Sequence, residues 1–335
     1  MTTAVTTLTN TIRTDVLRGL QEIENVSSFA DIERLFLRGV GHSNGTYKSY
    51  RSKVKIFYEF TNGLHPLCVK LADVEAFYDH RSEKVDRQTA CNDIQALKSL
   101  FQGVERVVPG YKSIMEKDSM PAKLWKKLNR SKDSGTKKAL IRSEVIKVFE
   151  FLKQGESERE VEDHALFRVL YGTGLRAQEI CNTTWGDIEF DEDEKTYYFN
   201  GIGKGSKAYH QECVDPESVK AAERYFKVAH HRKPRPGDRV FWTVPAYHGD
   251  VRRPLEYHPM YIRVVNIGKA LRAAGVIKRN LEFSPHLLRR SIITNLSKAG
   301  MRVKALQKFS RHASTDTLLK HYVDDEEPAS KYFSI

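Results

Sequence analysis

Two short stretches of the sequence pair an arginine with a second ionisable side chain three residues away. In YGTGLRAQEI the pair is Arg176 and Glu179, and in SPHLLRRS it is His286 and Arg289. Residues three apart share one face of a helix, so each pair can act on one ligand. A guanidinium has a permanent charge and a planar fork of donors, which suits an anion such as phosphate. Taken alone, each pair is more typical of a solvated helix face.

Two further stretches contain a lysine and a tyrosine. Lys204 lies in GIGKGSKAYH, where glycines permit a tight turn, and we expect it at the tip of a β-hairpin. The spacing excludes a Walker-type phosphate loop. In SRHASTDTLLKHYV, His312 precedes Tyr322 by ten residues, which a straight helix would spread over about 15 Å. We therefore expect a bend between them, with ASTDT capping a new short helix.

Taken in chain order, these side chains form a set that resembles the tyrosine recombinase family, the phage-type integrases and their Xer-like relatives. The stretches TGLRAQE, GKGSK, HLLR and RHASTDTLLKHY match four motifs of that family. The motif-level resemblance runs from about residue 142 to 325, whereas residues 41–130 are similar only as a basic helical domain. The catalytic set that the resemblance implies is Arg176, Lys204, His286, Arg289, His312 and Tyr322.

The resemblance implies that the arginines bind a phosphate of the DNA backbone. Arg176 and Arg289 would clamp its non-bridging oxygens, because their forks match phosphate geometry and never lose their charge. His312 would donate a third hydrogen bond to the same phosphate, and Glu179 would hold Arg176 in register. Fixed positive donors of this kind stabilise a pentacoordinate transition state.

The same resemblance assigns the nucleophile and the proton transfers. Tyr322 would attack the phosphorus in line and leave a 3′-phosphotyrosyl bond and a free 5′-hydroxyl group. Lys204 would protonate the leaving oxygen as general acid, and His286 would accept or orient a proton near the tyrosine. Because the new bond stores the energy of the broken one, we expect no ATP, no metal and no other cofactor.

The sequence departs from the family pattern at three places. Arg311 stands where many members have glycine before the histidine, and we interpret it as the mark of a subfamily. A common interval of nine residues after that histidine would select His321, which cannot form the stable ester, so we keep Tyr322 and rank Tyr332 far behind it. Lys207 is the alternative general acid if the register of the hairpin differs.

The charge distribution indicates a polyanionic partner. The chain has a net charge of +12 and a pI near 9.4. Residues 44–142 contain 20 Lys and Arg against 11 Asp and Glu, a net +9, so three quarters of the excess falls in under a third of the chain. We expect this segment to bind DNA phosphates. Its candidate contacts are Lys48, Arg51, Lys53, Lys55, Arg87, Lys98, Lys137 and Lys138.

Hydrophobic periodicity predicts a mainly α protein with a small antiparallel β-sheet and two domains. Residues 1–40 form an N-terminal segment to which the sequence assigns no role. Residues 41–130 are predicted as amphipathic helices, and the resemblance makes them a SAM-like core-binding domain that binds DNA. Residues 131–141 form a basic linker, and residues 142–335 form the catalytic domain with its C-terminal tail. We expect strands in KTYYFNGIGKGSKAYHQECV and DRVFWTV.

Composition excludes several classes of protein. The four cysteines are scattered without a C-x-x-C motif, so we expect buried free thiols and neither a zinc site nor a disulfide framework. No apolar run approaches the roughly 18 residues of a membrane span, and the first residues lack the pattern of a secretory signal. We therefore expect a cytoplasmic protein that associates with the nucleoid when it binds DNA.

The resemblance also implies partners. We expect double-stranded DNA with inverted-repeat-like core sites, a homotetramer on that DNA, an optional accessory DNA-bending protein, and a mobile genetic element as the source of the gene. The tail VDDEEPASKYFSI is either exchanged between protomers or an acidic disordered end. Two other activities stay open: a type IB topoisomerase with the same chemistry, and a sequence-specific DNA-binding protein that keeps the fold without catalysis.

Overall fold

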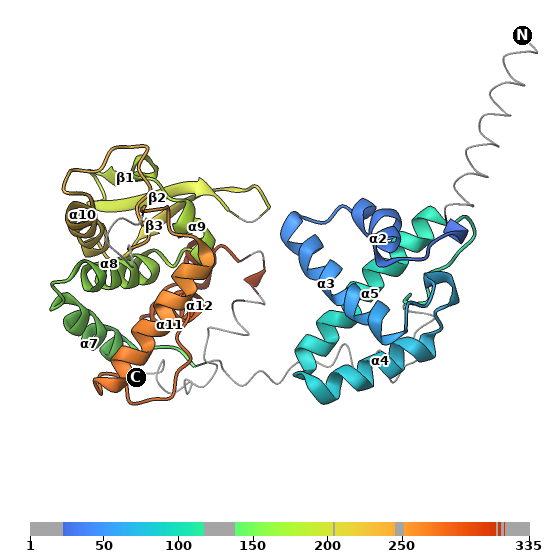
Figure 1. The fold of residues 1–335 in the computed structure, drawn as a ribbon. Coiled ribbons are helices and arrows are strands. Elements are labelled where there is room, and N and C mark those ends of the chain that lie inside the picture. The colour runs from blue at the N-terminus through green and yellow to red at the C-terminus, as the bar shows by residue number, and fades with distance from the viewer. Residues whose placement is uncertain are drawn as a thin grey trace, which may run out of the picture. The chain divides into compact units, whose positions relative to one another are not determined.

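The computed structural model describes residues 23–116, 138–203, 205–244 and 251–312, together with residues 314, 315 and 318. The chain divides into two compact units, Met1–Asp133 and Ser134–Ile335 (Figure 1). Residues 131–137 of the expected linker lie outside the described residues. In the described ranges each unit is mainly helical and the second contains a small antiparallel sheet, so the predicted fold class is confirmed.

The N-terminal unit is a bundle of helices. Polar side chains begin its longer helices: Ser43 accepts a hydrogen bond from the backbone of Thr46, and Asp86 accepts from the backbones of Gln88 and Thr89. The elements are α2 (Phe29–Ile32), the π-helix η1 (Glu33–Leu37), the 3₁₀ helices η2 (Arg38–Val40) and η3 (Pro66–Cys68), α3 (Asn44–Phe60), α4 (Leu71–Lys84) and α5 (Arg87–Val107).

Helix α5 forms the centre of this bundle. It contacts η1, α3 and α4, and one long face of it is buried. Gly103 permits the closest approach, because a Cβ atom there would lie 1.8 Å from the backbone oxygen of Phe36 in η1. The two helices are therefore held together at a residue without a side chain, a requirement that an amphipathic pattern does not reveal.

The second unit packs its helices around α8 (Glu158–Thr173), which is largely buried. Helices α7, α10, α11 and α12 all contact it. No helix in the described ranges is both long and apolar enough to cross a bilayer. The other elements of the unit are α7 (Arg142–Lys153), α9 (Ala177–Asn182), η4 (Trp185–Asp187), β1 (Ile188–Asp191), β2 (Thr196–Ile202), β3 (Ala208–Cys213), α10 (Glu217–His230), α11 (Tyr257–Ala273), α12 (Pro285–Lys298) and α13 (Val303–Ser310).

The sheet has three antiparallel strands in the order β1–β2–β3. Strands β2 and β3 form the expected hairpin, with Tyr197 opposite Cys213 and Ile202 opposite Ala208. The hairpin continues past the strands, because the backbone N–H of Gly203 donates to the oxygen of Lys207 at 2.8 Å. Strand β1 pairs with β2 and was not predicted, since its sequence IEFD is short and partly acidic.

The stretch DRVFWTV does not form a strand of this sheet, so that prediction was wrong. It makes isolated bridges at Arg239 and Trp242. Val240 and Phe241 are each 1% exposed. Two consecutive buried side chains do not follow the alternation of a strand with one solvated face. The apolar run that suggested a strand instead fills the core from an irregular segment.

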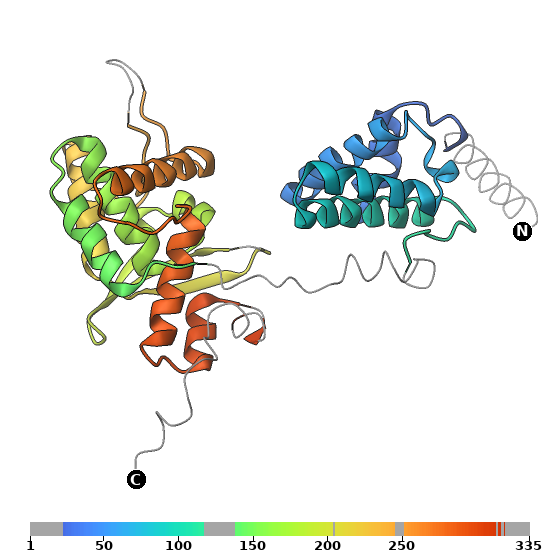
Figure 2. The same cartoon turned by 90° about the horizontal axis from the view of Figure 1, so that it is seen from below.

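Helices α12 and α13 join distant parts of the second unit. Helix α12 contacts both α8 and α13, and Figure 2 shows α12 and α13 as two neighbouring helices at the red end of the colour range. Gly174 ends α8 and Arg311 ends α13, both in the left-handed conformation with φ of 58° and 51°. A Cβ at Gly174 would lie 3.1 Å from the Phe309 ring, so a larger residue would be strained there both by its backbone and by its surroundings.

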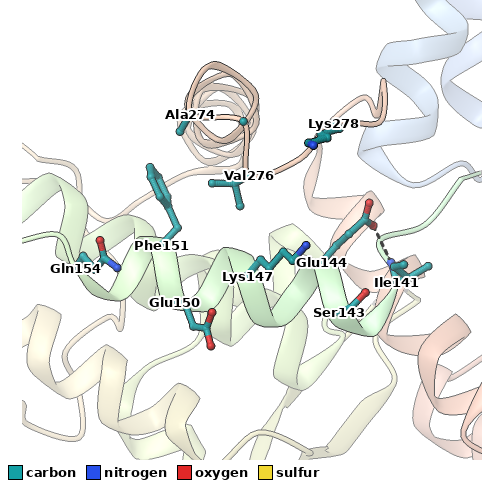
Figure 3. Close-up of a pocket in the computed structure, with 11 residues that line it drawn as sticks. Ile141, Ser143, Glu144, Lys147, Glu150, Phe151, Gln154, Ala274, Val276 and Lys278 are labelled. Carbon is teal, nitrogen blue, oxygen red and sulfur yellow. Dashed lines mark hydrogen bonds between the residues drawn. The ribbon is translucent and has the colours of Figure 1, made fainter.

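A groove of about 610 Å³ runs between α7 and the end of α11. Figure 3 shows Phe151 of α7 directed towards Ala274 and Val276, and Glu144 accepting a hydrogen bond from the backbone of Ile141. None of the described residues that the sequence predicted as catalytic lines this groove. The groove is therefore separate from the site described below.

Candidate active site

Arg176 and Glu179 lie together at the start of α9. The sequence predicted both within one helix, but Arg176 is the N-cap, one residue before it. Glu179 reaches back: one carboxylate oxygen accepts the Arg176 backbone N–H at 2.8 Å, and the other accepts Nη1 of Arg176 at 3.0 Å. The Arg176 side chain is 39% exposed. Its guanidinium is therefore held in place and still accessible to an anion.

Glu179 is the buried centre of an arginine cluster. Its side chain is 5% exposed, and besides Arg176 it accepts a hydrogen bond from Nη2 of Arg311. Burial by itself raises the pKa of Glu179, but the hydrogen bonds and charges of Arg311 and Arg176 outweigh burial and hold the pKa below its usual range. Glu179 is therefore a fixed anion shared by two cations.

Arg289 in α12 joins two helix ends, although it is only 2% exposed. Its Nη1 donates to the backbone oxygen of Gly174 at the end of α8, and its Nη2 donates to that of Ser310 at the end of α13. Arg176 follows Gly174 by two residues, and His312 follows Ser310 by two. Arg289 therefore holds both of these neighbouring segments to one place.

The two predicted histidines lie on different elements. His312 comes two residues after α13, with its Nδ1 2.8 Å from the hydroxyl oxygen of Ser310 and its backbone oxygen accepting from Gln307. These contacts fix the turn that carries the imidazole. His286 is exposed in the first turn of α12, three residues before Arg289.

The end of the β2–β3 hairpin reaches the arginine cluster. A Cβ at Gly203 would lie 2.9 Å from Oε1 of Glu179 and 3.5 Å from Nη1 of Arg311. The chain therefore passes the cluster one residue before Lys204. The site residues and alternatives that lie outside the described residues are Lys204, Tyr322, His321 and Tyr332.

Arg311 is a member of the cluster whose contacts the sequence did not predict. In addition to its bond to Glu179, its guanidinium carbon lies 4.4 Å from the centre of the Tyr209 ring. The side chain is 17% exposed. A signal was present, because an arginine stands at a position that favours glycine. The sequence did not reveal the partner, because Glu179 is 132 residues away and no local spacing connects the two.

The expected DNA contacts differ in how freely they can meet a phosphate. Arg51 pairs with Glu33 at 2.8 Å, and Lys55 pairs with Glu59 at 3.7 Å, so both share their charge with an acid. Lys98 is half-buried on α5. Exposed among the candidates are Lys48, Arg51, Lys55, Arg87 and Lys138, while Lys137 lies outside the described residues.

Lys53 is tied to the interior of the bundle. Its side chain is 20% exposed, and its Nζ lies 3.9 Å from the carboxylate of Asp93, which is 2% exposed. Asp93 also accepts a hydrogen bond from Arg81 at 2.7 Å. A buried carboxylate requires such cations, so these contacts favour a structural role for Lys53 over the DNA contact predicted for it.

The cysteines are only partly as expected. All four are free thiols, but Cys68 is exposed and Cys91 is half-buried. Burial raises the pKa of Cys181 and of Cys213 to about 12, so both thiols stay protonated and unreactive. In the part of the chain that the structure describes, no three His, Cys, Asp or Glu side chains gather as metal ligands would.

The fold is shared with solved structures of DNA recombinases. The XerH site-specific recombinase bound to palindromic difH substrate, in a post-cleavage complex, has a TM-score of 0.67 and 18% identity over 92% of this chain and 84% of that one. The Tn1549 transposon integrase in complex with transposon right end DNA has a TM-score of 0.65 and 20% identity over 90% and 97%. At these identities the likeness establishes the fold.

Sequence comparison identifies the family. A tyrosine recombinase of Pseudothermotoga lettingae is 27% identical over 191 residues, which cover 56% of this chain and 57% of the relative. The tyrosine recombinase XerC of Roseiflexus castenholzii is 22% identical over 279 residues, 82% of each chain. The model of the phage integrase family matches residues 138–328, more than half of the chain. The chain therefore belongs to the phage integrase family and is a site-specific recombinase of the tyrosine type, as its four motifs predicted.

Proposed function

We propose that this recombinase cuts and rejoins DNA strands through a 3′-phosphotyrosyl intermediate formed by Tyr322. The observation that supports the proposal best is the position of Arg289, which bonds the segment before Arg176 and the segment before His312. Two guanidinium groups and an imidazole from three parts of the chain are thus held near one another. Fixed cations of this kind suit a phosphodiester, whose anionic oxygens repel a nucleophile until their charge is met.

The two arginines would clamp the phosphate with charge that is already in position. Nη1 of Arg176 is fixed on Glu179, and its side chain remains 39% exposed. Arg289 has a permanent positive charge and is held by its bonds to the backbone oxygens of Gly174 and Ser310. Arg176 would then need little rearrangement to bind a phosphate, which is the condition under which electrostatic stabilisation lowers a barrier most.

Tyr322 would attack the phosphorus in line with the departing 5′ oxygen. The bond between phosphorus and the tyrosine oxygen forms as the bond to the 5′ oxygen breaks, so the phosphate stays on the 3′ strand end. His286 would accept or orient the phenolic proton. A 5′-hydroxyl group of a second strand can then reverse the attack and rejoin the DNA. Because each step exchanges one phosphate ester for another, the reaction would need neither ATP nor a metal.

Lys204 would give the leaving 5′ oxygen its proton. The preceding residue, Gly203, lies against Glu179 and Arg311, which supports a role for the next residue at the same phosphate. An alkoxide is a strong base, so a positioned acid matters most for this leaving group. Lys207 is the alternative acid; it is exposed on the opposite arm of the hairpin.

The partner would be double-stranded DNA with inverted-repeat-like core sites. Residues 142–335 would carry out catalysis, and residues 41–130 would bind the core site through exposed side chains such as Lys48 and Arg87. Contacts of this type release counterions, so affinity should fall steeply with salt. One active site per protomer and four strands to exchange imply a homotetramer on the DNA, within the nucleoid, with an accessory DNA-bending protein where the site requires one.

The test is covalent trapping on nicked suicide DNA that carries candidate inverted-repeat sites, without divalent metal and without ATP. The full-length protein is expected to form a protein–DNA adduct that survives denaturant, and Tyr322→Phe is expected to form none. Tyr332→Phe is the matched control, because it makes the same change ten residues further along the tail and should react normally. An adduct that persists in Tyr322→Phe would refute the assignment of the nucleophile.

A second substrate tests the general acid. When sulfur replaces the leaving 5′ oxygen, the departing thiolate needs no proton, because a thiol is far more acidic than an alcohol. Lys204→Ala should therefore cleave the oxygen substrate slowly and the sulfur substrate at the wild-type rate. Lys207→Ala is the matched control and should cleave both normally. If Lys207→Ala instead cleaves the oxygen substrate slowly and the sulfur substrate at the wild-type rate, Lys207 is the general acid.

A further inference from the structure

Charge balance in the arginine cluster depends on a residue outside the proposed catalytic set. Glu179 uses one oxygen for Nη1 of Arg176 and the other for the Arg176 backbone and Nη2 of Arg311. Two guanidinium charges and one carboxylate charge leave the three side chains with a net charge of +1. If Arg311 were neutral, the net charge would be zero, and the only guanidinium left to balance the buried carboxylate would be that of Arg176.

Arg311 is held in place by more than its bond to Glu179. Its guanidinium lies 4.4 Å from the centre of the Tyr209 ring, a distance typical of a cation over an aromatic face. It also lies beside Gly203 at the end of the hairpin. Its contacts therefore join α9, β3 and the turn after α13, and the next residue in that turn is His312.

The backbone at Arg311 argues that the side chain matters. With φ of 51°, the residue is in the left-handed region, where glycine would be free of strain and a larger residue is not. The arginine occupies this position at a conformational cost that glycine avoids, and it makes contacts that glycine would lose. The local fold of the turn alone does not require an arginine.

We propose that Arg311 is a positioning residue that balances the charge of Glu179, so that Arg176 can direct its own charge to the phosphate. The proposal rests on the function proposed above and adds a determinant of its rate. Arg311 itself need not touch the DNA. Arg311 acts through Glu179. When Arg311 already balances the charge of this buried carboxylate, the carboxylate cancels less of the positive potential of Arg176.

A double-mutant cycle separates charge balance from a purely structural role. Wild type, Arg311→Gln, Glu179→Gln and the double variant are compared by single-turnover cleavage of nicked suicide DNA at saturating protein, with DNA affinity and Tm measured in parallel. The net charge of the three side chains is +1, 0, +2 and +1 in that order. Arg311→Gln should slow cleavage about tenfold or more, less than loss of a direct phosphate donor, with affinity changed by less than about threefold.

The double variant gives the decisive outcome. Because it restores the net charge of +1, it should cleave at least about threefold faster than Arg311→Gln, although it has lost one more native hydrogen-bonding group. A residue that only held the fold together would give a double variant no faster than Arg311→Gln, and that result would overturn the proposal. Arg311→Lys, which keeps the charge without the fork, should lie between wild type and Arg311→Gln.

Two further variants guard against misfolding. Arg311→Gly removes the charge but suits the left-handed backbone, so it should keep the wild-type Tm more closely than Arg311→Gln and still cleave slowly. Arg311→Gly with wild-type cleavage would refute the proposal. Arg302→Gln is the matched control: Arg302 is exposed at the N-cap of the same helix, and its loss should leave the rate unchanged.

The two proposals fail in different ways. If the wild-type protein forms no adduct at Tyr322, the proposed function is wrong. If the wild-type adduct forms normally and Arg311→Gln cleaves as fast as wild type, the function stands and the charge-balance role of Arg311 is wrong.

Discussion

Replacing Arg289 by lysine tests whether the shape of the guanidinium, and not only its charge, builds the site. Two terminal nitrogens of Arg289 reach two carbonyls, Gly174 O and Ser310 O, that are more than 130 residues apart in the sequence. A lysine keeps the charge but offers one nitrogen on a flexible stem. It can bond one of these carbonyls well, but it cannot hold both and also present a planar fork to a phosphate.

The expected magnitude follows from these contacts. A hydrogen bond to a charged group contributes about 1.5–3 kcal/mol, so the loss of one should lower the free energy of unfolding by about 2 kcal/mol. For a unit of this size that corresponds to roughly 4–8 °C in Tm. The phosphate loses one fixed donor pair, which should slow cleavage by about 10²–10³-fold. Affinity for DNA should change little, because the net charge is the same.

The assay is single-turnover cleavage of suicide DNA together with thermal unfolding of the free protein. Arg290→Lys is the matched control, since Arg290 is the next residue of α12 and is half-buried rather than buried. It should cleave within about threefold of wild type, as surface changes usually do. If Arg289→Lys kept both the wild-type rate and the wild-type Tm, the idea that the fork joins α8 to α13 would be refuted.

Two stability measurements test other parts of the fold. Gly103→Ala places a methyl group 1.8 Å from the backbone oxygen of Phe36, so the free energy of unfolding measured in urea should fall by about 3 kcal/mol. Gly45→Ala is the control: no atom lies within 4 Å of the added methyl group, so the change should be neutral or stabilising. Equal effects of the two changes would contradict the close packing at Gly103. Burial raises the pKa of Glu162 to about 7 from 4.5. The free energy of unfolding should therefore fall as pH rises from 4.5 to about 7. Glu162→Gln should be more stable than wild type by up to roughly 3 kcal/mol at pH 8, but hardly more stable at pH 4.5. A difference in stability that does not change with pH would contradict this reasoning.

Local sequence patterns correctly predicted the elements whose conformation is determined by residues within one helical turn or one hairpin. Helix α3 lies in the segment predicted as basic amphipathic helices, and β2 and β3 form the predicted hairpin, although Gly201 and Ile202 belong to β2 and not to its turn. Helix α12 begins after Ser284, a residue type that favours the N-cap position. These elements depend on period, cap and turn residues, all of which are visible in the sequence.

Elements that depend on distant packing could not be predicted in the same way. The core around α8 buries Val240 and Phe241 together, so an apolar run that looked like a strand became an irregular segment. The close contact at Gly103 depends on Phe36, 67 residues earlier. The contact between Lys53 and Asp93 joins two helices, so no local spacing predicts it. In each case the deciding neighbour is far away in the chain.

The motifs identified the arginines of the candidate site, but they did not predict which groups hold these arginines in place. Arg176 shares Glu179 with Arg311, so its cluster retains a net charge of +1. Arg289 is buried against the last carbonyls of α8 and α13. Helix C-termini carry partial negative charge and unsatisfied carbonyls, so they can stabilise a buried cation.

Each of these two arrangements lowers the cost of holding a cation in the protein. The shared carboxylate leaves a net charge of +1 on the side chains of Arg176, Glu179 and Arg311, and Arg289 holds the segment before Arg176 in place. An anion that binds beside this cluster can then complete the charge balance, and a phosphodiester whose non-bridging oxygens gain negative charge during attack is such an anion.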